Sequence, residues 1–139
     1  MHLTSFTDYG LRTLMYLAAC PEEMSSVKEI SEHYGISRNH LVKVVHRLSQ
    51  LGYIKTLKGK GGGIQIVNGT EKLRLGDLIT QLEPNMTVVE CFNPETNTCN
   101  ISGTCNLKHY LFESTKSFTD TMNKYTLADA VSSGFDIES

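Results

Sequence analysis

Apolar side chains recur at intervals of three and four residues along most of this chain, the spacing that gathers them on one face of an α-helix. The pattern predicts helices over residues 4–20, 27–34, 38–51 and 75–82. Ser26 and Ser37 stand where two of these helices begin, and their hydroxyl groups suit them to cap the first backbone N–H groups. Gly35 and Gly52 stand where the same two helices end. The chain is therefore predicted to be mainly α-helical.

One short segment breaks the helical pattern. Residues 53–57 and 64–67 are rich in β-prone side chains, and the run Lys58-Gly-Lys-Gly-Gly-Gly63 separates them. Two such runs around a glycine-rich turn predict a β-hairpin. A phosphate-binding Walker loop is disfavoured, because that motif needs Gly-Lys followed by Ser or Thr and then a helix.

The hairpin directly follows two predicted helices that are joined by a turn at Gly35. One face of the second helix carries its apolar residues, which are Leu41, Val44, Val45, Leu48 and Leu51. The polar and basic residues at the start of this helix therefore lie on another face. Two helices joined in this way and followed by a basic hairpin are typical of a winged helix-turn-helix.

A longer helix is predicted near the C-terminus. Its apolar stripe consists of Leu107, Leu111, Phe112, Thr115, Phe118 and Met122. A small winged helix does not require so long a helix, so we expect it to pair with the same helix of a second copy of the chain. Packing of the stripe on residues 4–20 of its own chain is the alternative.

The predicted fold class is mainly α with a small β-hairpin, divided into three parts. Residues 1–83 form a winged helix-turn-helix DNA-binding domain, whose first helix also contributes to the dimer. Residues 84–106 form a cysteine-containing loop, and residues 107–139 form the dimerisation helix and C-terminal tail. Within that last part we expect a short turn over residues 126–131 and a frayed tail over 132–139.

Charge is distributed unevenly along the chain. The net charge is −2, yet no Asp or Glu occurs between His33 and Thr70, where six Lys and Arg residues are found. From Asn68 onward, ten acidic residues outnumber five basic ones. A basic segment within an acidic protein indicates a local binding site for a polyanion such as DNA. A solvated charged face is the alternative.

Composition is that of a globular protein, with 139 residues and 40% hydrophobic side chains. We expect no secretion signal, because the N-terminus has no basic region followed by an apolar one. No apolar run approaches the roughly 20 residues needed to cross a bilayer. The expected location is the cytoplasm, where thiols stay reduced and grouped cysteines more often bind metal or do redox chemistry than form structural bridges.

Three of the four cysteines, Cys91, Cys99 and Cys105, lie in one polar loop. Seven residues separate the first pair and five the second, wider than the Cys-x-x-Cys pairs of most zinc sites. The spacing favours an iron–sulfur cluster, with zinc and reactive thiols as alternatives. A fourth ligand must come from elsewhere, and the candidates are an exogenous molecule, Asp8, Glu90, His109 and Cys20.

Several motifs follow one another along the chain: Leu3-Thr-Ser-Phe-Thr-Asp-Tyr-Gly-Leu-Arg12, Ser37-Arg-Asn-His-Leu-Val-Lys43, Gly59-Lys-Gly-Gly-Gly-Ile64, the three loop cysteines and Lys124-Tyr-Thr-Leu-Ala-Asp129. Together they resemble the nitric-oxide-sensing branch of the iron–sulfur winged-helix transcription regulators. The resemblance covers almost the whole chain. It implies a homodimer in which each chain holds one cluster, [4Fe-4S] in preference to [2Fe-2S], through the three cysteines.

The resemblance also bears on the fourth ligand. It implies that Asp8 completes the site, from its own chain or from the partner. Arg12 follows Asp8 by one helical turn, a position from which it can orient the carboxylate. A plain surface ion pair between Asp8 and Arg12 is equally compatible with their spacing. In the IscR-like branch a histidine three residues after the last cysteine is the ligand. Lys108 occupies that position here and His109 follows it, which disfavours that branch.

The predicted function is therefore transcriptional repression of double-stranded operator DNA, released when nitric oxide reacts with the cluster. In this hypothesis Ser37, Arg38, Asn39 and His40 approach base edges, and Lys43 a phosphate. Lys58 and Lys60 in the wing follow the neighbouring backbone or minor groove. No catalytic constellation is found, so no enzyme is expected. The alternatives are a regulator of the same fold with an iron–sulfur or redox signal, a zinc-binding protein or a thiol redox protein.

Overall fold

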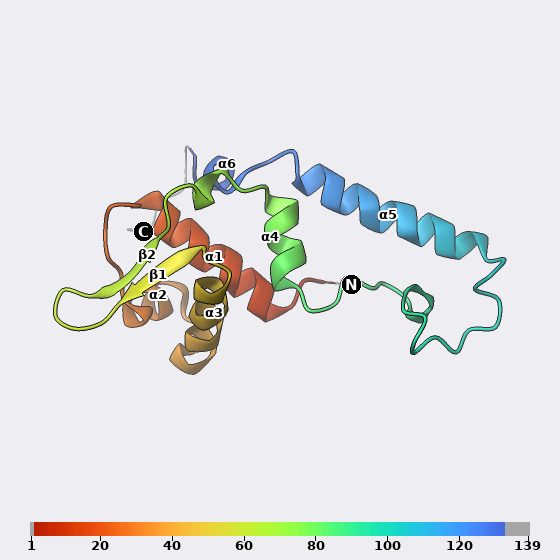
Figure 1. Ribbon diagram of the computed structural model, residues 1–139, viewed down its shortest axis with the longest axis horizontal. Helices are drawn as coiled ribbons and strands as arrows, with labels where there is room; N and C mark the ends of the chain where they lie inside the picture. The colour runs from red at the N-terminus through yellow and green to blue at the C-terminus, as the bar shows by residue number, and fades with distance from the viewer. Residues whose placement is uncertain (1, 133–139) are drawn as a thin grey trace.

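The computed structural model describes residues 2–132 and is mainly helical (Figure 1). Its elements in chain order are α1 (Ser5–Ala19), α2 (Val27–Tyr34), α3 (Arg38–Gln50), β1 (Ile54–Leu57), β2 (Gly63–Ile66), η1 (Thr70–Lys72), α4 (Leu75–Leu82), η2 (Glu90–Phe92), α5 (Asn106–Met122) and α6 (Leu127–Val131). The predicted fold class is confirmed. All but the first residue of the expected frayed tail, 132–139, lies outside the described residues.

Helix starts follow the capping residues expected from the sequence. The side chain of Ser26 accepts a hydrogen bond from the Glu29 N–H at 3.0 Å, which begins α2. Ser37 accepts one from the His40 N–H at 3.4 Å, which begins α3. Gly35, with φ of 67°, ends α2 in the left-handed conformation that glycine adopts without steric cost. The short turn between α2 and α3 is therefore set by local sequence.

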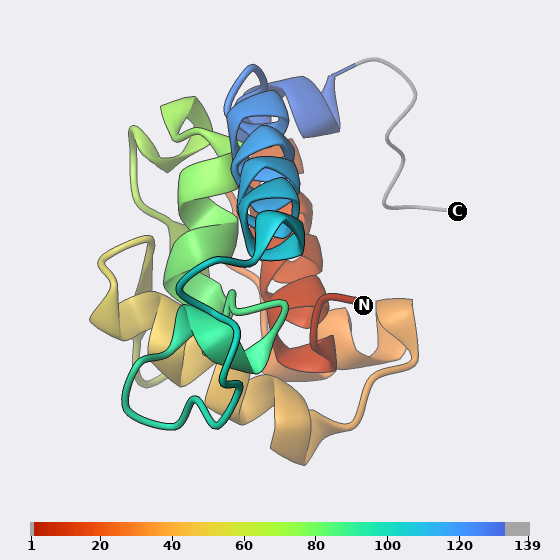
Figure 2. The same ribbon diagram turned by 90° about the vertical axis from the view of Figure 1, so that its right-hand side faces the viewer.

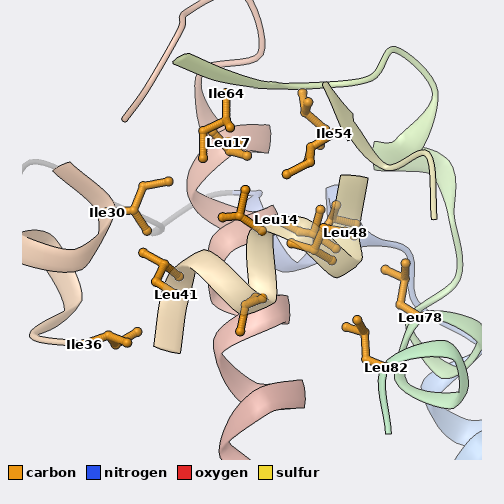
Figure 3. Packing of buried hydrophobic residues seen from close by; sticks show 14 residues of the cluster. Leu14, Leu17, Ile30, Ile36, Leu41, Leu48, Ile54, Ile64, Leu78 and Leu82 are labelled. Carbon is orange, nitrogen blue, oxygen red and sulfur yellow. The ribbon is translucent and has the colours of Figure 1, made fainter. Parts of the chain in front are cut away.

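Helix α1 runs through the centre of the winged-helix body, as Figure 3 shows. Its Leu14 and Leu17 are buried against Leu41 and Leu48 of α3 and against Ile64 of β2. Apolar burial of this kind is the main stabilising term in a small domain. The core thus fixes α3 and the hairpin relative to α1.

The hairpin is held to the body by more than its own pairing. Strands β1 and β2 pair antiparallel, with Ile54 opposite Ile66 and Leu57 opposite Gly63. Ser25, just before α2, exchanges backbone hydrogen bonds with Ile64 at 2.9 and 2.7 Å. A Cβ atom on Gly63 would lie 2.5 Å from the Ser25 carbonyl oxygen, so this close approach requires glycine. The base of the wing is therefore fixed, while its tip extends away.

Helix α5 extends well beyond the body, as the blue helix of Figure 1 shows, and carries the cysteine loop at its far end. Its C-terminal end lies against α4, and Figure 2 views the molecule from the opposite end. No residue of α5 is buried. Leu107, Tyr110 and Phe112 are exposed by 60% or slightly more, so its first half presents apolar side chains that its own chain leaves largely uncovered. None of the helices within residues 2–132 is long and apolar enough to span a membrane.

The opposite end of α5 is fastened to the start of α4 by Asn123. Its side-chain oxygen accepts a hydrogen bond from the Asp77 N–H at 2.9 Å, and its amide nitrogen donates to the Asp77 carboxylate at 3.2 Å. The Arg74 guanidinium donates to the Asn123 carbonyl oxygen at 3.0 Å. Because Arg74, at the N-cap position, makes no side-chain cap, Asn123 caps α4 from 46 residues away. These hydrogen bonds anchor the C-terminal end of α5 to the start of α4.

Gly76→Ala is expected to loosen this anchor. A Cβ atom there would clash with the Asn123 side-chain oxygen and lie 2.6 Å from the Thr119 carbonyl oxygen. Alanine normally stabilises a helix relative to glycine, but overpacking of this kind costs about 1–3 kcal/mol, so the net effect should be destabilising. Chemical denaturation measures it. Gly103→Ala is the matched control, because nothing lies within 4 Å of its added Cβ atom; equal stability of both variants would contradict the prediction.

Candidate DNA-binding surface and cysteine loop

The outward side of α3 carries the residues expected to contact DNA. Arg38, Asn39 and Lys43 are exposed, as is the N-cap residue Ser37. His40 is half-buried, and its ring packs edge-on against Tyr9 of α1 with centroids 4.9 Å apart. Four of these five side chains therefore face solvent, while His40 also joins α3 to α1.

Sequence reasoning missed Val42, which lies among these residues and is 53% exposed. The signal was available, because Val42 falls outside the apolar set that lines the buried face of α3. An aliphatic side chain on the outward face of such a helix can contact the methyl group of thymine in a major groove. The outward face of α3 therefore offers apolar as well as polar contacts.

The wing places two lysines on the outside of the molecule. Lys58 and Lys60 are exposed in the turn between β1 and β2. Gly59 and Gly61 have φ of 92° and 80°, conformations that side chains other than glycine rarely adopt. A Cβ atom on Gly62 would lie 2.9 Å from the Gly59 carbonyl oxygen. The glycines therefore serve the tight turn itself and leave the backbone open to close approach by a ligand.

The basic residues between His33 and Thr70 form no salt bridges within the described residues. The salt bridges within residues 2–132 join Arg12 to Asp8, Lys28 to Glu32 and Lys116 to Asp120. None of them involves the six basic residues of the acid-free segment. Unpaired surface cations are available to phosphate groups without first breaking a protein ion pair.

The cysteine loop joins α4 to α5 at the end of the molecule remote from the wing (Figure 1). Cys91 lies in the single turn η2, Cys105 immediately precedes α5, and Cys99 lies between them. All three are free thiols of intermediate exposure. The ring of Phe92 packs edge-on against Phe112 of α5 with centroids 6.1 Å apart, which pins the Cys91 turn to that helix.

Polar side chains shape the loop around Cys99. The side-chain oxygen of Asn97 accepts a hydrogen bond from the Cys99 N–H at 2.9 Å, and its amide nitrogen donates to the Ser102 hydroxyl at 2.9 Å. That hydroxyl in turn donates to the Cys99 carbonyl oxygen at 3.1 Å. The segment around Cys99 is therefore held in shape by hydrogen bonds within residues 97–102.

The donor set of this loop suits a soft metal centre. Three uncrosslinked thiols on one loop can supply the thiolates that iron–sulfur clusters require. Within residues 2–132, however, no three metal-binding side chains converge closely enough to hold a single ion. A hollow of about 380 Å³ beside the loop is lined by Cys91, Phe92, Pro94, Lys108, His109 and Phe112. The residue types fit a cluster, which would require a fourth donor beside these three thiols.

Asp8, the favoured fourth ligand, is bound to Arg12 in the structure. The Arg12 guanidinium donates to the two carboxylate oxygens at 2.7 and 3.2 Å. It also lies 5.6 Å from the ring centroid of Tyr9 and 5.9 Å from that of Tyr34. Burial raises the pKa of Tyr34 to about 12, so its hydroxyl stays protonated and donates to the Arg12 carbonyl oxygen at 3.0 Å. Tyr34 thus contacts both the backbone and the guanidinium of Arg12, and the Asp8 carboxylate is half-exposed beside that guanidinium.

The other candidate ligands have different surroundings. His109 lines the hollow beside Cys91. Glu90 accepts hydrogen bonds from Thr98 within the loop itself. Cys20 occupies the position just after the C-terminal end of α1. The loop cysteines thus have two candidate donors within or beside the loop, and Asp8 and Cys20 lie at opposite ends of α1.

Known proteins are similar to this chain over nearly its whole length. Residues 3–133 match the Rrf2 family, described as an iron-dependent transcriptional regulator. The HTH-type transcriptional regulator NsrR of Bacillus subtilis (strain 168) is 46% identical over 138 residues, which are 99% of this chain and 94% of that protein. A second relative of the same name, from Shouchella clausii (strain KSM-K16), is 46% identical over 94% of this chain and 89% of that protein.

Solved structures share the fold at lower identity. The global cysteine regulator CymR (YrzC) of B. subtilis has a TM-score of 0.76 at 22% identity, covering 95% of this chain and 97% of that chain. IscR of T. potens has a TM-score of 0.74 at 23% identity, covering 94% of this chain and 86% of that chain. At these identities the two structures establish a common fold alone.

Proposed function

The chain belongs to the Rrf2 family of transcriptional regulators, and from that premise we propose that it is a DNA-binding repressor that senses nitric oxide through an iron–sulfur cluster. The family resemblance noted from the sequence is confirmed, and regulators of this kind are not enzymes. Its relatives are bacterial proteins, and a bacterial transcription regulator acts on DNA in the cytoplasm, so the cytoplasm is the proposed location. Its direct partner is double-stranded operator DNA.

One observation carries the sensing part of this proposal. Three free thiols lie on the segment that leads directly into α5, whose other end is fastened to α4 by Asn123. Cys91, Cys99 and Cys105 would hold the cluster, [4Fe-4S] in preference to [2Fe-2S], one in each chain. When bound, the cluster supplies iron atoms that react with nitric oxide. Release of the thiolates would free the loop and so change the position of α5.

A second copy of the chain is the proposed partner of α5. Leu107, Tyr110 and Phe112 project from a helix that has no buried residue. Covering these side chains would remove apolar surface from water, which favours association. Two copies related by a twofold axis would also present two α3 helices to successive major grooves. In such a dimer Asp8 of one chain could reach the loop of the other.

The proposed DNA contacts fall into two groups. Ser37, Arg38, Asn39 and His40 at the start of α3 would meet base edges, with Lys43 near a phosphate. Lys58 and Lys60 in the wing would contact the backbone or the minor groove alongside. The unpaired basic segment supports this arrangement, because phosphate binding needs free cations. Nitric oxide would have to change the ratio of bound to free operator from about 99:1 to 1:99. The free energy of DNA binding must then differ by about 5.5 kcal/mol between the two states of the protein.

The proposal is tested by purification without oxygen, followed by absorption spectra and binding to DNA fragments selected from a random library. We expect iron, acid-labile sulfide and tight binding before nitric oxide is added, and weak binding afterwards. If the purified protein contained zinc, or free thiols and no iron, the proposed cluster would be wrong. Unchanged DNA affinity after nitric oxide, with the cluster present, would point instead to iron–sulfur supply or redox state as the signal.

Asp8→Ala is expected to change the absorption spectrum of the cluster and to hasten its loss to a chelator, because one iron would lose its carboxylate ligand. Removal of a supporting contact alone typically costs 10- to 100-fold in metal affinity, so loss of a ligand should cost about that or more. Asp120→Ala is the matched control, since Asp120 also pairs with a basic residue one turn away. A spectrum identical to that of the unaltered protein would remove Asp8 from the ligand set.

A further inference from the structure

Glu90 and Thr98 tie the two sides of the cysteine loop together. One carboxylate oxygen of Glu90 accepts hydrogen bonds from the Thr98 hydroxyl at 2.9 Å and from the Thr98 N–H at 3.4 Å. The other oxygen lies 3.2 Å from the same hydroxyl. Both residues are exposed, so the contact belongs to the loop and not to the core.

The positions of these two residues give the contact its significance. Glu90 immediately precedes Cys91, and Thr98 immediately precedes Cys99. Each partner of the hydrogen bonds is therefore the neighbour of a proposed thiolate ligand. On the Cys91 side the turn is fixed to α5 through Phe92 and Phe112. The Glu90–Thr98 contact joins that side to the Cys99 side.

We propose that Glu90 is a positioning residue, whose carboxylate brings the Cys91 and Cys99 segments together before any cluster is bound. The inference rests on the proposed function, because it assigns a task in cluster binding. An open loop must lose conformational entropy when two of its residues bind one object, and a contact that has already closed it lowers that cost. In this proposal Glu90 does not bind iron; it positions Cys91 and Cys99, which bind the cluster together with Cys105 and the fourth ligand.

The second hydrogen-bonded group of the loop supports this assignment. Asn97 and Ser102 shape the backbone around Cys99 alone, since all their bonds stay within residues 97–102. They set the conformation of that side but do not connect it to Cys91. Among the polar contacts of the described loop, the Glu90–Thr98 contact is the one that joins two cysteine-bearing sides.

The metal-free chain tests the proposal directly. In a Cys20→Ser, Cys105→Ser background, a short reagent with two alkyl bromides can bridge Cys91 and Cys99, each thiolate displacing one bromide. Mass spectrometry gives the ratio of bridged product to product modified by two separate reagent molecules. We expect Glu90→Ala to lower this ratio about fivefold, the effect of losing roughly one net hydrogen bond. Glu95→Ala, which removes the same charge from the same loop, should leave it unchanged.

Further variants separate the roles of the two residues. Thr98→Val removes the hydroxyl and keeps the N–H, so its ratio should fall between those of Glu90→Ala and the unaltered loop. Glu90→Gln retains an acceptor oxygen and should restore most of the bridging. Equal ratios for Glu90→Ala and Glu95→Ala would overturn the proposal. Circular dichroism of each variant confirms that the helices are intact.

The cluster-bound protein provides the second measurement. A chelator should remove iron about fivefold faster from Glu90→Ala than from the Glu95→Ala control, with the absorption spectrum unchanged. A changed spectrum would make Glu90 a ligand and would overturn the positioning role. If the unaltered chain binds no cluster, the proposed function fails, while the bridging ratio in metal-free protein still decides whether Glu90 closes the loop.

Discussion

Cys99→Ser is expected to abolish stable cluster binding and, with it, the response of DNA affinity to nitric oxide. A serine hydroxyl is a hard, weakly acidic donor, whereas iron–sulfur clusters are held by thiolates. Loss of a supporting contact costs 10- to 100-fold in metal affinity, so loss of a direct ligand should cost more than about 100-fold. Iron and sulfide content per chain, followed by titration of operator DNA with and without nitric oxide, measures both effects.

The fourth cysteine supplies the control for this prediction. Cys20 ends α1 and lies outside the cysteine loop, so Cys20→Ser removes a thiol without touching the proposed site. It should retain its iron and its nitric oxide response. A Cys99→Ser protein that binds DNA and responds to nitric oxide as the Cys20→Ser protein does would show that the cluster is not the switch.

Arg38→Ala is expected to relax the choice of base at one or two positions of the operator. A guanidinium that donates two hydrogen bonds to a guanine is worth about 1–3 kcal/mol of discrimination against another base. Arg38 is exposed at the first position of α3, and none of the ion pairs in the described chain engages it. Binding to operator fragments with single base changes measures the effect. The preferred fragment should lose affinity, and the altered fragments should lose little.

Lys58→Ala in the wing should behave differently, because a phosphate contact is insensitive to sequence. Its affinity should fall by a similar factor for every fragment, and the slope of log affinity against log salt should decrease by about one. Lys116→Ala is the matched control, since Lys116 is an exposed lysine paired with Asp120 on α5, a helix that lies away from α3 in Figure 1. If Arg38→Ala and Lys58→Ala affected every fragment alike, α3 would not be the helix that reads the bases.

Much of the fold could be predicted because its determinants are local. Ser26, Ser37 and Gly35 set the boundaries of α2 and α3 through contacts within four residues or through their own backbone angle. The wing followed from two β-prone runs around glycines, and its positive φ angles explain why those residues are glycine. The long α5 followed from its apolar spacing. The candidate site residues could also be identified from the sequence, because the three cysteines of the loop and the lysines of the wing lie close together along the chain.

The sequence by itself determined the class of fold, the basic segment and the three thiols of the loop. Tertiary structure alone decided that Asn123 caps α4 from 46 residues away, that Tyr9 packs on His40 and that Glu90 binds Thr98. These contacts depend on where whole helices and loops lie, and polar residues of their kinds leave no periodic pattern. The exposure of Val42 and of the first half of α5 was decided in the same way, since burial depends on what packs against a face and not on the face alone.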